Sequence, residues 1–252
     1  MPIMNRPGEE FMFKTRYEFS GPSDQQLGLP QPPLFRRHPL AGEAVALPPP
    51  VEFSLPPRDV PTLVTSRVSR REYSTQSLTL AELSWLLWAT QGIKGVYGGN
   101  YAALRTVPSA GARHALETYL VVNRVEELGS GLYQFLPLEH AVARLPDEGS
   151  LARRVAVACL GQAIVVTSAV TFIWSAVPDR MTWRYGQRGY RYLHLDAGHV
   201  CQNLYLAAEA LDAGCCAIAA FDDERMAALL KLDPAEEFVI YLATVGKVVR
   251  RE

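Results

Sequence analysis

The strongest hydrophobic pattern in the chain lies in its C-terminal half, between residues 185 and 212. From Gly189 onward, apolar residues recur every three or four positions: Leu193, Ala197, Val200, Leu204, Ala207 and Leu211. This spacing predicts a long helix with at least one deeply buried face. Asp196, His199 and Asn203 share one stripe of the same helix.

Shorter patterns predict the elements around this helix. A capping box at residues 79–82, followed by apolar residues at helical spacing, predicts a helix that ends near Gly92. We expect a glycine-rich loop at 95–100, strands at 117–125, 131–136, 141–145, 163–170, 215–221 and 238–245, and helices at 151–160 and 222–231. Because strands and helices are interspersed without strict alternation, the expected fold is α+β, with a mixed central β-sheet flanked by helices.

Residues 1–66 differ from the rest of the chain because they are rich in proline, with PQPP at 30–33 and PPP at 48–50. Proline lacks a backbone donor and fixes φ, so long regular elements are not expected here. The segment nevertheless keeps aromatic residues, Phe11, Tyr17 and Phe35 among them. We therefore expect an extended arm that packs on the body or on a partner subunit, with residues 67–252 as the main domain; a flexible tail is the alternative.

Composition sets broad limits on function. Of the 252 residues, 48% are hydrophobic and 20% charged, which is enough for a sizeable core. A net charge of −1 gives no reason to expect nucleic acid or an anionic membrane as partner. No apolar signal segment or membrane-length apolar run is apparent, so we expect a cytoplasmic protein. The four cysteines, at 159, 201, 215 and 216, lack metal-ligand spacing and are expected to be buried thiols.

Three short stretches carry candidate chemistry. If residues 67–71 are extended, Arg67, Ser69 and Arg71 share one side and form a phosphate cradle; a solvated charged loop is the alternative. The small residues at 108–112 and 217–220 would let backbone approach a flat ligand closely, although ordinary turns explain them equally well.

The polar stripe of the long helix also has two interpretations. Asp196, His199 and Asn203 are suited to a metal or a charge relay, but a hydrogen-bonded polar stripe is favoured because no further ligand is placed by the sequence. We predict no metal site. GxSxG, HExxH, P-loop and GxGxxG motifs are absent from the sequence.

Taken together, these stretches resemble a known family. Residues 67–73, RVSRREY, resemble the R-x-S-x-[KR]-x-[FY] opening of the nitroreductase superfamily, which binds FMN. Closer similarity is to the SagB-type dehydrogenases within it, and it is carried by SLTLAELSWLLWATQGI, VPSAGARHALETYLVV, GLYQFLPLEHAVARL and WRYGQRGYRYLHLDAGHVCQNLYLAAEAL. The proline-rich QPPLFRRHPL and the tail from AIAAFDD to VGK also fit, so the resemblance covers nearly the whole chain.

The resemblance implies a nitroreductase-like homodimer with FMN at the subunit interface. Arg67, Ser69 and Arg71 would hold the phosphate and ribityl chain. Pro108, Ser109 and Ala110 of the other subunit would lie against the ring system. The backbone of Ala219 and Ala220 would lie near the reactive flavin nitrogen, where many relatives carry Glu-Gly, and Lys247 and Arg250 would add positive charge near the phosphate.

The resemblance also implies a reaction. SagB-type enzymes oxidise thiazoline or oxazoline rings of a precursor peptide to azoles, passing a hydride to the flavin while a base removes a proton. Relatives use a Lys-Tyr pair, and the matching residues here are Arg184 and Tyr185. Because arginine is always charged, Tyr185 would accept the proton with Arg184 as a neighbouring cation, unless the pair is structural.

Three hypotheses about function follow. The first is an FMN-dependent SagB-type dehydrogenase that acts on a modified peptide or a related small substrate. The second is an NAD(P)H-dependent reductase of nitro compounds or quinones. The third is a non-catalytic partner subunit of a peptide-modifying complex that contains a cyclodehydratase.

Overall fold

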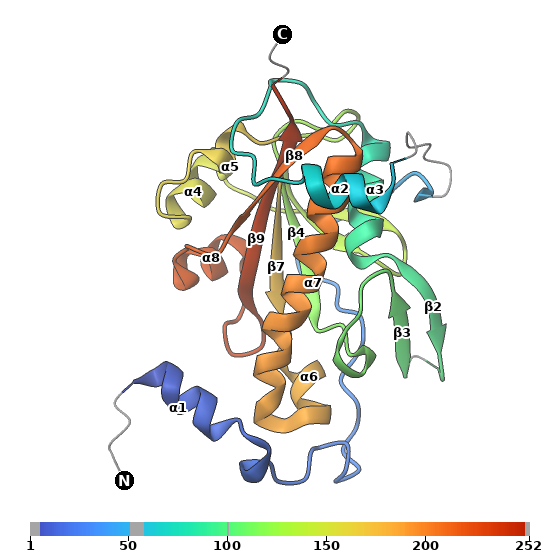
Figure 1. Ribbon diagram of the computed structural model, residues 1–252, viewed down its shortest axis with the longest axis vertical. Helices are drawn as coiled ribbons and strands as arrows, with labels where there is room; N and C mark the ends of the chain where they lie inside the picture. Colours follow the sequence, from blue (N-terminus) through green and yellow to red (C-terminus); the bar gives the residue numbers. More distant parts are fainter. Residues whose placement is uncertain (1–5, 51–57, 100, 250–252) are drawn as a thin grey trace.

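The computed structural model describes residues 6–50, 58–99 and 101–249, and a seven-stranded sheet lies at its centre (Figure 1). The strand order is β1 (Ala44–Ala46), β6 (Ala141–Leu145), β5 (Gly131–Leu136), β4 (Leu116–Val122), β7 (Val170–Ala176), β9 (Phe238–Lys247) and β8 (Ala213–Ile218). The predicted α+β class is confirmed. The sheet is antiparallel rather than mixed, because every strand pair in it is antiparallel and parallel pairing in the described residues is confined to isolated bridges such as Ser69–Cys215.

Helices cover both faces of the sheet. One face carries α3 (Leu80–Gln91) and α7 (Gly189–Ala210), and the other carries α4 (Leu151–Ala158), α5 (Ile164–Thr167) and α8 (Asp223–Leu230). Side chains of β4 alternate between them: Leu116 and Leu120 join the core under α7, and Tyr119 and Val121 join the core under α4 and α8. A sheet covered on both sides needs strands that are apolar throughout, which explains their continuous hydrophobic runs.

Several local predictions are confirmed. Thr79 caps α3, and the reciprocal bond from the Thr79 backbone N–H to Glu82 completes the capping box. The long helix forms as α7, with Leu193, Val200 and Leu204 buried. All four cysteines are buried free thiols.

Two predicted elements are wrong. Residues 163–170 do not form a strand: α5 occupies 164–167, and β7 begins at Val170. Periodicity cannot separate a short buried helix from a strand when the run is apolar throughout. The predicted loop at 95–100 is partly a strand, because β2 (Ile93–Tyr97) pairs with β3 (Ala102–Arg105); Asn100 lies outside the described residues.

The N-terminal arm contains more helix than expected and packs on the body. It forms α1 (Pro7–Lys14), η1 (Tyr17–Phe19), β1 and α2 (Val60–Ser66), and in both helices a proline occupies the first turn, where no N–H is needed. Trp183 anchors the arm: its backbone oxygen accepts a bond from Gln25 N–H at 2.8 Å, and its indole N–H donates to the Leu29 carbonyl at 2.9 Å.

The remaining elements are η3 (Ala110–Ala112), α6 (Pro178–Tyr185) and η4 (Gly186–Arg188), the last two of which lead into α7. In the described ranges, no helix has the length and apolar character needed to cross a membrane.

Candidate active site

The segment that follows α2 runs along the outer edge of β8. Ser69 forms a bridge with Cys215, and the Arg70 N–H donates to the Cys215 carbonyl at 3.0 Å. Tyr205 of α7 receives the segment: its hydroxyl accepts a bond from Ala217 N–H at 2.8 Å and lies 3.0 Å from Ser69 Oγ. The Arg67 guanidinium stacks 5.1 Å above the centre of the Tyr205 ring. Arg67 and Ser69 are therefore brought together over α7, as the extended-backbone prediction requires.

Tyr73 fixes the end of this segment. Its hydroxyl donates to the Arg70 carbonyl at 2.9 Å and lies 2.7 Å from Thr244 Oγ1. Its ring lies flat on two glycines, since a Cβ at Gly246 would come within 2.9 Å of Tyr73 Cγ and one at Gly214 within 3.2 Å of Cε1. The two glycines are needed for this close approach, and burial raises the pKa of Tyr73.

A hollow of about 560 Å³ opens beside the segment and is lined by residues 68–72, 248 and 249. Arg71 lines it and lies near Cys216: burial raises the pKa of that thiol, and the Arg71 charge acts against the rise. Lys247 is directed elsewhere, because its ammonium pairs with Glu82 and lies 3.4 Å from the Leu211 carbonyl oxygen. Arg250 lies outside the described residues.

A second group of residues forms around the loop at 108–112. Asp196 of α7 accepts bonds from Ser109 Oγ at 2.5 Å and from Ala110 N–H at 3.2 Å, and Ser109 Oγ in turn accepts a bond from His114 N–H at 2.9 Å. Burial raises the pKa of Asp196, and the two bonds oppose that rise. The carboxylate therefore fastens this loop to α7; Pro108, at its start, is exposed.

The polar stripe on α7 is accounted for by these contacts. Asn203 donates to the Ala89 carbonyl at 2.9 Å, and His199 is exposed. In the described parts of the chain, no set of three or more His, Cys, Asp and Glu side chains is placed to hold a metal ion. Asp196 and Asn203 thus have the hydrogen-bonded role that the sequence favoured.

Gly111 brings this loop against Arg184 and Tyr185. Its φ is +57°, and a Cβ there would lie 2.6 Å from the Tyr185 hydroxyl oxygen and 2.8 Å from Arg184 Cδ. The Arg184 guanidinium lies 5.8 Å from the centre of the Tyr185 ring, which packs edge-on against Tyr192 at 4.9 Å. The expected proton-transfer pair and the expected ring-binding loop are therefore neighbours in one chain.

Arg113 lies beneath this contact and was missed by sequence reasoning. It is 1% exposed, donates to the carbonyls of Gly111 at 3.0 Å and Tyr101 at 2.9 Å, and is enclosed by the rings of Tyr101 and Trp183. Burial lowers the pKa of Arg113, and the Arg184 charge adds to this effect. Arginine is rarely buried, so no sequence pattern signals such a position.

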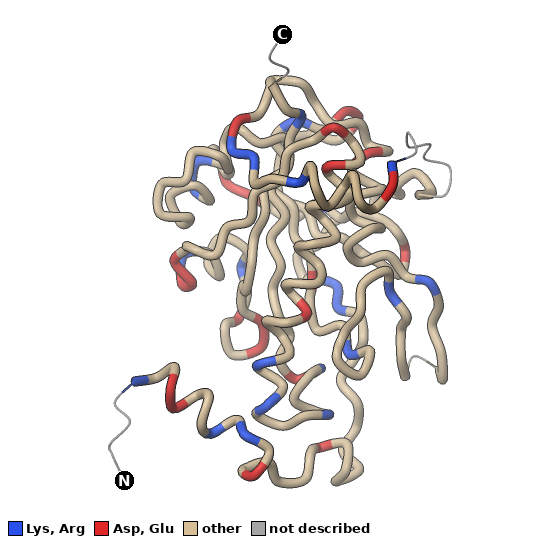
Figure 2. Tube along the Cα trace, viewed as in Figure 1, with Lys and Arg blue, Asp and Glu red and all other residues tan. Residues whose placement is uncertain are grey.

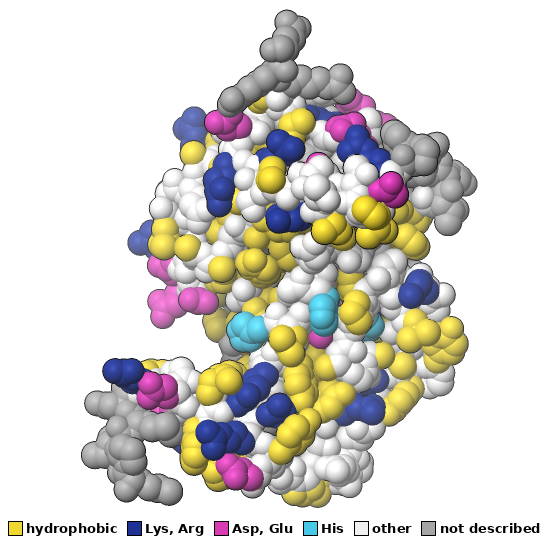
Figure 3. Space-filling model, in the orientation of Figure 1, with side chains coloured by type: hydrophobic (Ala, Val, Ile, Leu, Met, Phe, Trp, Pro, Cys, Tyr) yellow, Lys and Arg dark blue, Asp and Glu magenta, His cyan; other side chains and the backbone are white. Residues whose placement is uncertain are grey.

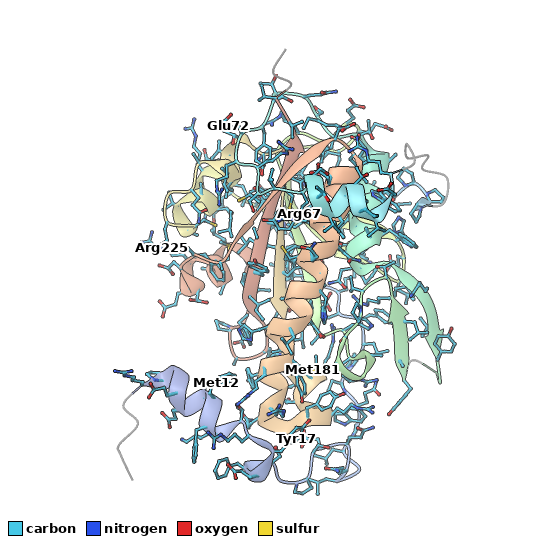
Figure 4. All side chains as sticks on the ribbon, in the orientation of Figure 1. Met12, Tyr17, Arg67, Glu72, Met181 and Arg225 are labelled. Atoms are coloured by element: carbon cyan, nitrogen blue, oxygen red, sulfur yellow. The ribbon has the colours of Figure 1, made fainter. Side chains whose placement is uncertain are left out.

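The two groups of residues lie at different heights along α7. Asp196 holds one and Tyr205 the other, which at 1.5 Å per residue places them about 14 Å apart along the helix axis. Figure 4 shows Arg67 beside the upper half of α7 and Met181 of α6 at the foot of that helix. Ala219 and Ala220 are exposed and follow β8, and the Ala220 carbonyl accepts a bond from Gln162 at 3.2 Å.

His114 should make stability depend on pH. Burial lowers its pKa to about 3, whereas an unfolded histidine titrates near 6.5, so between these values the unfolded chain binds more protons and the unfolding free energy falls as pH drops. We expect His114→Asn to flatten this slope by up to about 1.4 kcal/mol per pH unit. Asparagine tolerates the positive φ of +43° at this position. Urea unfolding at a series of pH values measures the slope; equal slopes in both proteins would contradict the prediction.

Comparison with known proteins assigns the chain, rather than its individual site residues, to a family. The model of the nitroreductase family matches residues 64–247. MJ1384 of Methanocaldococcus jannaschii, whose name assigns it to the nitroreductases, is 36% identical over 187 residues, which cover 74% of this chain and 90% of that protein. The trifolitoxin-processing protein TfxB of Rhizobium leguminosarum bv. trifolii is 28% identical over 154 residues, covering 54% of this chain and 41% of that protein.

Solved structures share the fold. A nitroreductase-type protein of Anabaena variabilis superposes with a TM-score of 0.63 at 31% identity, over 75% of this chain and 38% of that one. A nitroreductase-type protein of Ralstonia eutropha superposes with a TM-score of 0.67 at 24% identity, over 88% of this chain and 100% of that one. A chain of the Escherichia coli microcin synthetase McbBCD complex superposes with a TM-score of 0.61 at 20% identity, over 79% of this chain and 76% of that one. The last two likenesses show the fold alone.

Proposed function

This chain belongs to the nitroreductase family, and from this premise we propose that it is an FMN-dependent oxidoreductase of the SagB type. The family is one of oxidoreductases and typically binds FMN. The SagB subtype is supported by the quoted stretches and by the similarity to TfxB, which is named for processing trifolitoxin. The substrate proposed is a thiazoline or oxazoline ring of a modified peptide, or a related small molecule.

The residues at the β8 edge fit a phosphate group. Arg67 and Arg71 form no ion pair with any residue the structure describes, and Ser69 is exposed beside them. Unpaired guanidinium groups next to a hydroxyl match the donors that a phosphate needs. We propose that these three residues hold the FMN phosphate and ribityl chain. Lys247 contributes less, because Glu82 already neutralises its charge.

The proposed flavin site is completed by a second copy of the chain. In one chain the segment at 67–71 and the loop at 108–110 lie about 14 Å apart along α7. As the family resemblance implies, Pro108, Ser109 and Ala110 at each flavin would come from the partner. The outer side of α7 supports a homodimer, because Leu195 is 59% exposed there and a Cβ at Gly198 would meet open space. Figure 3 shows hydrophobic and histidine side chains on this face.

The contact of Gly111 with Tyr185 and Arg184 carries the catalytic part of the proposal. The backbone of this loop would face the flavin ring, and Tyr185 lies where a glycine alone leaves room for its hydroxyl. When bound, FMN would supply the two-electron acceptor for the substrate hydride. Tyr185 would act as a tyrosinate that takes the substrate proton and becomes neutral, and the permanent charge of Arg184 would stabilise the tyrosinate before the transfer. The backbone of Ala219 and Ala220 would lie near the reactive flavin nitrogen, and the methyl side chains of these two residues would add no further chemistry.

The absorption spectrum of the purified protein tests the proposal. A yellow protein that is bleached anaerobically by a thiazoline-bearing peptide, but not by NADPH, supports the SagB-type dehydrogenase. A colourless protein that does not take up added FMN would overturn the flavin assignment.

The similarity to MJ1384 supports a second candidate, an NAD(P)H-dependent reductase of nitro compounds or quinones, because it is both higher and longer than the similarity to TfxB. Rapid bleaching by NADPH would favour it. The third candidate, a non-catalytic subunit of a cyclodehydratase complex, is supported by arginine at 184 and alanines at 219 and 220, and predicts that no substrate bleaches the flavin.

Replacing Gly111 by alanine should reduce the turnover of a thiazoline-bearing peptide by more than tenfold, while the protein keeps its flavin. The positive φ costs an L-residue about 1–2 kcal/mol, and the new Cβ would displace the Tyr185 hydroxyl, which is 2.6 Å away. Gly149→Ala is the matched control, since no atom lies within 4 Å of its Cβ position and its φ is not positive. Equal turnover in both variants would show that Tyr185 need not occupy its present position.

A further inference from the structure

Arg184 has no anionic partner within the described chain. Its half-buried side chain lies against Gly111, with the guanidinium 5.8 Å from the centre of the Tyr185 ring, but it makes no side-chain hydrogen bond or ion pair with another described residue. No nitrogen of Arg184 is among the fully buried unsatisfied side-chain atoms, so the guanidinium remains accessible to an incoming acceptor. A cation that is accessible, free of ion pairs and next to the proposed proton acceptor is suited to bind an anionic group of a ligand.

The surroundings of Arg184 strengthen this argument because they leave positive charge uncompensated. Arg113, Arg188 and Arg191 also lack ion pairs in the described ranges: Arg188 donates to the Tyr192 hydroxyl and the Thr15 carbonyl, and Arg191 to Thr15 Oγ1 and the Met12 carbonyl. These acceptors are neutral. Figure 2 shows basic positions gathered around α6 and the start of α7, and Figure 3 shows their side chains on the surface there.

The two acidic residues of α6 and the first half of α7, Asp179 and Asp196, do not balance the charge. Asp196 is occupied by Ser109 and Ala110. Asp179 is exposed in the first turn of α6, one and a half turns before Arg184, and makes no ion pair with the described residues. Several guanidinium groups in a partly enclosed place raise the local concentration of anions.

We propose that Arg184 binds a carboxylate of the substrate, so that this protein selects molecules with a negative charge close to the bond that reacts at Tyr185. The inference rests on the proposed function, because it assigns the substrate to the site of Gly111 and Tyr185. A planar guanidinium holds a carboxylate through two parallel bonds, which fixes orientation as well as charge. Arg184 then orients the substrate while it remains a cation beside Tyr185, and the lysine of the relatives would not provide the same fork.

The test compares two probes that differ mainly in charge. 4-Nitrobenzoate and 4-nitrobenzamide are titrated into the FMN-loaded protein, and dissociation constants are read from the change in flavin absorption. We expect nitrobenzoate to bind at least about tenfold more tightly, since hydrogen bonds to charged groups are stronger than neutral ones. Arg184→Gln should abolish the preference without loss of flavin, and Arg184→Lys should restore part of it.

Arg191→Gln is the matched control, because it removes the same charge from a guanidinium that the arm already holds through Thr15 and Met12. It should keep most of the preference. Equal affinity for both probes in the unmodified protein, absence of nitrobenzoate binding, or an equal loss in the two glutamine variants would each overturn the assignment. If the protein takes up no FMN, the titration cannot be carried out. That result refutes the proposed function and not the role of Arg184.

Discussion

Replacing Arg67 and Arg71 together by alanine should weaken FMN binding by at least about a hundredfold. Each guanidinium is free of ion pairs within the described chain and would give charge-assisted bonds to phosphate, worth about 1.5–3 kcal/mol apiece. Ser69 and the neighbouring backbone remain and account for residual binding. The measurement is a titration of FMN with the flavin-free protein, followed by quenching of flavin fluorescence.

The matched control removes the same two charges from another surface. Arg153 and Arg154 lie on α4, on the opposite side of the sheet, and line a separate hollow of about 410 Å³ that also includes Arg225. Arg153→Ala/Arg154→Ala should bind FMN within about threefold of the unmodified protein, since distant surface charges are screened by salt. Full flavin affinity in the Arg67/Arg71 variant would refute the phosphate site.

Tyr185→Phe should slow flavin reduction by a thiazoline-bearing peptide about 10²–10⁴-fold, the usual contribution of a positioned proton acceptor. FMN should stay bound, because the ring remains to pack against Tyr192. Stopped-flow bleaching under anaerobic conditions measures the rate. Under the reductase alternative the same change should leave bleaching by NADPH nearly unaffected, since hydride transfer from a nicotinamide releases no proton to a base.

Tyr192→Phe is the control for this experiment. Its hydroxyl lies 3.0 Å from that of Tyr17 and accepts a bond from Arg188 at 2.8 Å, so it serves the arm. We expect a loss of less than tenfold. If Tyr185→Phe retains the original rate, the proton acceptor is another group; if both variants lose equally, the tyrosine cluster acts by packing.

Local patterns predicted most of the fold. The capping box of α3, the period of α7 and the β5–β6 hairpin each involve residues that are close in sequence, so local patterns are enough to predict them. Predictions failed where burial was uniform, as at residues 163–170, because a continuous apolar run has no period that separates helix from strand.

The candidate site was less accessible to sequence reasoning. Arg67 and Ser69 were placed on one side by their alternation, and they do meet at Tyr205. The contact of Gly111 with Arg184 depends on how α6 and the 108–112 loop pack, and no spacing within either segment encodes it. The burial of Arg113 depends on the rings of Tyr101 and Trp183, which come from distant parts of the chain.

The position of residues 69–73 against β8 also bears on how the protein avoids self-association. An outermost strand with free amide and carbonyl groups is a template for another chain, and β8 would be such a strand if the bridge at Ser69 and the bond from Arg70 did not occupy part of its edge. At the other end of the sheet, β1 is short and is followed by prolines 48–50, which cannot extend a ladder. The arginines proposed to bind FMN thus belong to a segment that also covers part of the exposed edge of β8. Substitutions that detach this segment from β8 would promote aggregation as well as loss of FMN.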